Sequence, residues 1–175
     1  MTKAIFKIYE NNKFVLGAWV KSDGGVRPNS IFPYVMENTI MAGDYNLKYT
    51  FYESITNYIQ ETNFRVMFGN KKNPFSLQSN SEGMKPVDVL FWENNLSDKK
   101  LLNENVWGEY IYEIRFTKKA LKVKVDYASN TREWINKKAE LHDDFIEQIL
   151  QEVAEWVDNI DFGLNDCDCD KEENN

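Results

Sequence analysis

The stretch from Glu109 to Tyr127 constrains the fold more than any other part of the chain. Apolar residues alternate with polar ones on both sides of Lys118-Lys119, as in two strands that each bury one face. A turn at these lysines gives every residue a suitable partner: Phe116 with Leu121, Ile114 with Val123 and Tyr112 with Val125 on the inner face, and Glu113 with Lys124 on the outer face. The pattern therefore predicts an antiparallel hairpin with one buried face.

A second hairpin is predicted at residues 3–20, because Asn11-Asn12 supplies turn chemistry between two runs rich in aromatic and β-branched residues. The expected register pairs Glu10 with Lys13, Tyr9 with Phe14 and Ile8 with Val15, and it sets Phe6 opposite Gly17. Further along the chain we expect a helix at 53–60 and short strands at 64–68 and 86–92, whereas 31–52 is ambiguous between strand and irregular structure.

Three polar stretches are expected to be loops. Residues 22–30 contain Asp23-Gly24-Gly25 beside Arg27, which has the elements of a phosphate cradle but matches no phosphate-binding motif, so a hairpin loop is the simpler interpretation. Residues 70–86 form a long surface loop by composition. The stretch 94–105 is also polar, and its leucines are expected to tether it to the core: Leu96, Leu101 and Leu102.

The C-terminal part of the chain predicts one long amphipathic helix, or two in tandem. Asn130-Thr131-Arg132-Glu133 resembles a helix N-cap, and the helical pattern continues to about Ile160. One face is apolar: Leu141, Phe145, Ile146, Ile149, Val153, Trp156, Val157 and Ile160. The opposite face is what we call the acidic ridge, about 27 Å long at helical rise: Glu140, Asp144, Glu147, Gln151, Glu155 and Asp158.

The pattern as a whole predicts an α+β fold. We expect a mostly antiparallel sheet built from hairpins and packed by the C-terminal helix, in a single domain spanning residues 1–163. Residues 164–175 have nothing to bury and are expected to form a disordered acidic tail. No membrane span or signal peptide is visible, and the only two cysteines lie in the tail, so a reducing cytoplasm is the expected location.

Charge is distributed unevenly along the 175 residues, whose net charge is −7. Residues 1–130 carry 17 Lys and Arg against 14 Asp and Glu, whereas residues 131–175 carry 4 against 14, which gives +3 and −10. A concentrated acidic region repels nucleic acid and anionic membranes and speeds encounter with basic proteins. We therefore expect a basic protein partner, and neither nucleic acid nor a membrane.

Candidate chemical sites do not exceed the ordinary structural interpretation of their residues. His142, the only histidine, lies on the apolar side of the predicted helix, and Cys167 and Cys169 with neighbouring aspartates lack the spacing of a closed zinc site. The lysines at 118, 119, 122 and 124 lie opposite the aromatic face of the hairpin, so protection of an edge strand explains them as well as nucleic-acid binding does. No catalytic motif is present, so we predict no catalytic residues, no cofactor and no metal.

In general character the chain is similar to bacterial toxin-immunity proteins, which are compact, acidic and cytoplasmic and lack catalytic motifs. The similarity is one of type, and no residue role is carried over from it. It implies a non-enzymatic inhibitor that neutralises a basic partner such as a nuclease toxin, with Glu140, Asp144, Glu147, Glu155 and Asp158 as the contact residues. Two alternatives remain: an enzyme or small-ligand protein with a pocket between sheet and helix, and a scaffold subunit of a phage or mobile element.

Overall fold

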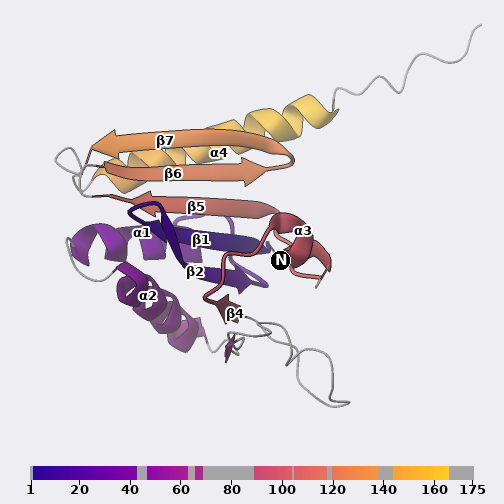
Figure 1. The fold of residues 1–175 in the computed structure, drawn as a ribbon. Helices are drawn as coiled ribbons and strands as arrows, with labels where there is room; N and C mark the ends of the chain where they lie inside the picture. Colours follow the sequence, from indigo (N-terminus) through magenta and orange to yellow (C-terminus); the bar gives the residue numbers. More distant parts are fainter. Residues whose placement is uncertain are drawn as a thin grey trace, which may run out of the picture.

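A computed structural model describes residues 2–42, 47–62, 66–68, 89–103, 105–117, 120–137 and 144–165 of the chain. These residues form an α+β fold (Figure 1). The elements follow one another as β1 (Ala4–Glu10), β2 (Lys13–Val20), α1 (Ile31–Ala42), α2 (Leu47–Thr62), β3 (Val66–Phe68), β4 (Val89–Trp92), α3 (Asp98–Asn103), β5 (Tyr110–Phe116), β6 (Ala120–Tyr127), β7 (Asn130–Lys137) and α4 (Asp144–Asn165).

The strands form one mixed sheet in the order β3-β4-β2-β1-β5-β6-β7. Strands β1 and β5 are parallel, as are β3 and β4, and the other neighbouring pairs are antiparallel. Parallel neighbours need a long crossover connection, and the chain between β2 and β5, which contains α1 and α2, supplies one. The sheet is therefore not built from hairpins alone, because β1 and β5 join two hairpins side by side.

The hairpin predicted from the alternating pattern is confirmed. Strands β5 and β6 pair Phe116 with Leu121 and Glu113 with Lys124, and the two pairs between them also match the predicted register. The residues of the predicted turn, 118 and 119, lie outside the described chain. Inner and outer faces are separated as expected, because burial alternates residue by residue along both strands.

The N-terminal hairpin is confirmed at its turn and wrong further in. A bulge at Ile8 and Tyr9 takes Val15 out of the ladder, so that Ile8 pairs with Leu16. The bulge shifts the rest of the register by one residue and places Gly17 opposite Lys7. The gap at this glycine is filled from the other neighbouring strand, because a Cβ atom there would lie 2.1 Å from the indole ring of Trp92.

The predicted start of the C-terminal helix is wrong. Residues 130–137 form β7, which pairs with β6, and the helix begins at Asp144 and continues to Asn165. A two-residue turn at Ala128 and Ser129, both with positive φ (48° and 66°), joins the two strands. Its backbone is of the kind that Asn-Gly usually adopts, so the sequence gave no turn signal there, and Asn130 looked like a helix cap.

Helices occupy most of the region that the sequence left ambiguous, since α1 and α2 replace the expected strand or irregular structure at 31–52, and α2 contains the predicted helix at 53–60. The predicted short strands are present as β3 and β4. Within the stretch 94–105, Leu96 and Leu101 are buried as expected, but Leu102 is 61% exposed on α3. Of the predicted tail, only residues 164 and 165 are described, and they end α4.

Helices α1, α2 and α4 cover one face of the sheet, with α4 running along β6 and β7 (Figure 1). The main core between these layers contains Phe6, Phe32, Tyr112 and Val153. A smaller core on the other face buries Ile5, Leu90, Trp92, Leu96, Leu101 and Val106 beneath α3 and its flanking segments. On that face, the outward side chains of β5 to β7 are polar, and they are described with the candidate site below.

Candidate binding surface and pocket

Helix α4 presents two faces of opposite character. Its inner residues Ile149, Val153 and Val157, spaced four apart, are buried against the sheet, as the sequence predicted. The described members of the acidic ridge are all exposed on the opposite side: Asp144, Glu147, Gln151, Glu155 and Asp158. The remaining members and neighbours from the sequence analysis, Glu140, Leu141 and His142, lie outside the described residues.

The carboxylates of the ridge are not neutralised within the described part of the chain. Residues 144–165 contain six Asp and Glu and no Lys or Arg. The one cation bonded to α4 in the described ranges is Arg132, which lies 3.6 Å from Glu152 on the flank of the helix that faces β7. The ridge itself holds one polar contact, from the Gln151 amide to Glu155 at 3.1 Å. The outer face of α4 is therefore a continuous negative surface.

Phe162 extends this surface with an apolar group that the sequence analysis did not single out. Its side chain is 74% exposed, and it follows Asp158 by four residues, so it lies on the ridge side of the helix. The spacing from Asp158 was the available signal. An exposed aromatic ring beside carboxylates is a typical anchor in protein interfaces.

The flank of α4 opposite the pocket described below is fixed to β7. The indole nitrogen of Trp134 donates a hydrogen bond to Glu152 at 2.8 Å, and its ring meets Trp156 edge to face with centroids 5.8 Å apart. Arg132 lies 5.0 Å from the Trp134 ring. These contacts fix the rotation of α4 about its axis, and with it the direction in which the ridge points.

A pocket of about 920 Å³ opens between the loop at residues 23–30 and the C-terminal half of α4. Its other walls come from the start of β5 and the end of β6, through Tyr110 and Tyr127. From α4 it receives Asp158 and Asp161. Asp158 therefore belongs to both the ridge and the pocket, which are continuous. The sequence analysis did not find this pocket, because its walls come from segments that are far apart in the chain.

Side chains of the main core hold the 23–30 loop in place. The buried Tyr112 hydroxyl donates to the carbonyl of Gly24 at 2.9 Å, and the Tyr58 hydroxyl donates to the Asp23 carboxylate at 3.0 Å. Gly24 has no space for a side chain, since a Cβ atom there would lie 2.4 Å from that of Ala4. This loop joins β2 to α1, so the expectation of a hairpin loop was wrong.

Two phenols and several carboxylates set the electrostatics of the pocket. The Tyr127 hydroxyl donates to Asp161 at 2.8 Å, and the Tyr127 and Tyr110 rings have centroids 4.8 Å apart. Burial, then the hydrogen bond to and the charge of Asp161, with smaller effects of Glu109 and Asp158, raise the pKa of Tyr127 to about 12. Burial and the same carboxylates also raise the pKa of Tyr110. A site that disfavours phenolate favours a cation.

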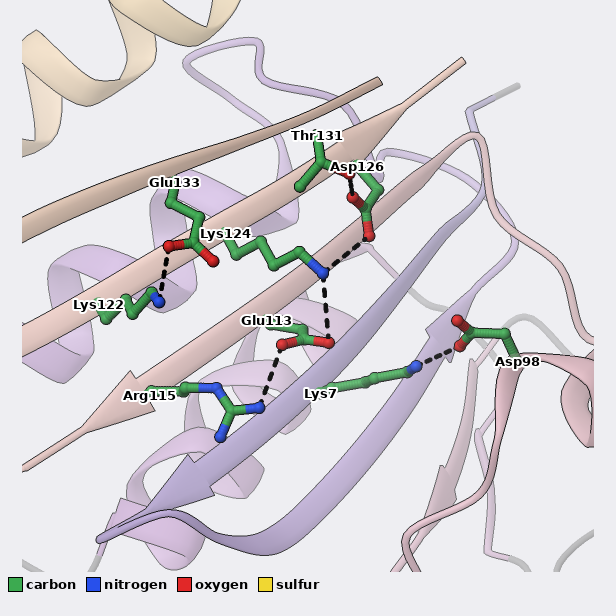
Figure 2. A network of polar contacts seen from close by, with 9 residues as sticks. All are labelled: Lys7, Asp98, Glu113, Arg115, Lys122, Lys124, Asp126, Thr131 and Glu133. Carbon is green, nitrogen blue, oxygen red and sulfur yellow. Dashed lines mark hydrogen bonds and ion pairs between the residues drawn. The ribbon is translucent and has the colours of Figure 1, made fainter. Parts of the chain in front are cut away.

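The opposite face of the sheet carries a balanced set of charges (Figure 2). Arg115 and Lys124 both approach Glu113, at 3.3 and 3.8 Å, and Lys122 pairs with Glu133 at 2.6 Å. Figure 2 also shows the remaining contacts of the set: Lys124 with Asp126, Thr131 with Asp126, and Lys7 with Asp98 from α3. Four cations and four carboxylates thus meet, in contrast to the one-sided charge of α4.

This arrangement corrects the interpretation of the lysines. Lys122 and Lys124 do point away from the aromatic face, but β6 lies inside the sheet between β5 and β7, so they do not protect an edge. They form ion pairs with neighbouring strands, and the hydrogen bond from Lys122 lowers the pKa of Glu133. Lys118 and Lys119 lie outside the described residues.

Within the described ranges, no group of three or more His, Cys, Asp or Glu side chains has the arrangement of a metal site. Cys167 and Cys169 lie beyond those ranges. No helix among the described residues is long and apolar enough to cross a membrane. No family model, curated protein or solved structure matches the chain.

Proposed function

We propose that the chain is a non-enzymatic binding protein of the inhibitor or immunity type, which neutralises a basic protein partner such as a nuclease toxin in the cytoplasm. The observation that carries this proposal is the outer face of α4, where the ridge carboxylates point to solvent without a neutralising cation among the described residues. Such a field attracts a basic partner and raises its association rate.

The surroundings of the ridge support a docking role over that of an ordinary solvated face. Phe162 supplies an exposed ring at one end of the surface, and the contacts of Trp134 with Glu152 and Trp156 hold the helix in one orientation. A rigid surface loses little conformational entropy when it binds. The charges of the sheet's outer face, by contrast, pair with one another and leave no comparable field there.

A specific observation also favours a second candidate function, a small-ligand protein. The pocket beside Tyr127 has the size of known ligand sites, which range over about 300–1,000 Å³. Its lining contains no recognised set of catalytic residues. Metabolite screening by thermal shift tests this candidate, since a ligand that stabilises the protein in the absence of any protein partner would favour it.

The leading proposal is tested by affinity capture of the tagged protein from its native cell lysate, with the product of the upstream gene co-expressed. The informative variant is Glu147→Lys/Glu155→Lys on the ridge. Its matched control is Glu37→Lys/Glu53→Lys, which makes the same change in net charge at exposed positions of α1 and α2.

We expect the wild type and the control to retain a stoichiometric basic partner that high salt releases. The ridge variant should bind it more weakly by on the order of tenfold or more, because reversed charges repel the partner. Equal retention of the partner by all three proteins would show that the ridge is a solvated face, and the lack of any basic partner would contradict the function itself.

A further inference from the structure

The pocket beside the ridge carries an excess of negative charge. Its lining contains four carboxylates, Asp23, Glu109, Asp158 and Asp161, and one cation, the exposed Arg27. Asp23 already accepts the Tyr58 hydrogen bond. Within the described chain, Glu109 and Asp158 have no ion pair, and Asp161 accepts only the hydroxyl of Tyr127. Three carboxylates thus remain available to a cationic group.

The shape and chemistry of the pocket select among cations. The Tyr127 hydroxyl contacts both oxygens of Asp161, at 2.8 and 3.1 Å, and so fixes the orientation of that carboxylate beside a phenol ring. A planar guanidinium can stack on an aromatic ring and bond a carboxylate through two N–H groups at once. An ammonium group offers a point charge without this match.

We propose that this pocket receives the guanidinium of an arginine carried by the basic partner, with Asp158 and Asp161 as its acceptors and Tyr127 as its aromatic wall. This assignment rests on the proposed function for the source of the arginine. Asp158 connects the two sites, because the ridge attracts the partner and the pocket then holds one of its side chains. The volume of about 920 Å³ exceeds the need of one side chain, so the arginine enters on an exposed loop together with flanking residues.

The test begins with a probe that does not require the partner. N-acetyl-arginine amide is titrated into the full-length protein and followed by NMR, with N-acetyl-citrulline amide as a neutral isosteric control. The variants are Asp158→Asn alone and Asp158→Asn/Asp161→Asn. The matched control is Asp144→Asn/Glu147→Gln, which removes two ridge charges outside the pocket. Asp158→Asn is safe for folding, because Asp158 has no hydrogen bond or ion pair within the described chain.

We expect the arginine probe to shift resonances of the pocket residues in a saturable way and to bind on the order of tenfold more tightly than the citrulline probe. The pocket variants should lose this preference, and the ridge control should keep it. The same pocket variants should weaken the complex with the captured partner by a similar factor. Arginine and citrulline probes that bind equally would overturn the proposal.

The arms also separate this proposal from the function on which it rests. If the partner responds to Glu147→Lys/Glu155→Lys but not to Asp158→Asn, the ridge function stands and the pocket assignment is overturned. If the arginine probe binds the pocket but no basic protein is captured, the proposed function fails, and the pocket serves a free cation instead.

Discussion

Replacement of Tyr112 by phenylalanine would measure how firmly the core holds the wall of the pocket. Tyr112 is fully buried, and its hydroxyl donates to Gly24 at 2.9 Å. The substitution removes that one oxygen and keeps the ring, which stacks on Phe32 with centroids 4.2 Å apart and on Phe6 at 5.0 Å. The change therefore isolates a single buried hydrogen bond.

The expected loss is about 1–3 kcal/mol of unfolding free energy, because the Gly24 carbonyl stays buried without its donor. For a chain of this size this corresponds to a fall in Tm of roughly 2–12 °C. Urea unfolding followed by tryptophan fluorescence measures the loss, with an unchanged slope on denaturant as evidence that only stability has altered. The control is Tyr127→Phe, which removes a hydroxyl that water can replace. A loss below about 0.5 kcal/mol for Tyr112→Phe, or one no larger than the control's, would refute the reasoning.

Three further predictions concern stability. Changing Ala128-Ser129 to Asn-Gly should raise the unfolding free energy by about 1 kcal/mol, because both positions have positive φ; an unchanged urea midpoint would contradict it. Gly17→Ala should cost about 1–3 kcal/mol, since the new Cβ meets the Trp92 ring, and calorimetry that shows no loss would exclude that clash. Stability should also fall as pH rises from 10 to about 12, because unfolded tyrosine releases its proton at the lower value and folded Tyr127 at the higher. Urea midpoints across this range, with Tyr127→Phe showing a shallower fall, test that sign.

Local patterns predicted the parts of the structure that depend on local physics. The β5–β6 register followed from alternation along two adjacent strands, and the buried and exposed faces of α4 followed from helical spacing. The start of that helix was missed because Asn130 to Glu133 fits a cap, whereas pairing with β6 decides the outcome. Tertiary pairing is not visible in such a window.

The ridge and the pocket differ in the same way. All ridge residues belong to one helix, so their common face could be read from spacing alone. The pocket joins the 23–30 loop, Tyr110, Tyr127 and the end of α4, and it exists only because β5 lies parallel to β1 and α4 crosses back over the sheet. No spacing in the sequence encodes that meeting.

The central claim is that the outer face of α4 guides a basic protein into a complex. It is tested most directly by stopped-flow association rates with the purified partner, measured as a function of salt for the wild type, Glu147→Lys/Glu155→Lys and Glu37→Lys/Glu53→Lys. The account predicts a rate that falls steeply with salt for the wild type and the α1–α2 control, and a slow, nearly salt-independent rate for the ridge variant. Three parallel salt dependences with equal rates would contradict it.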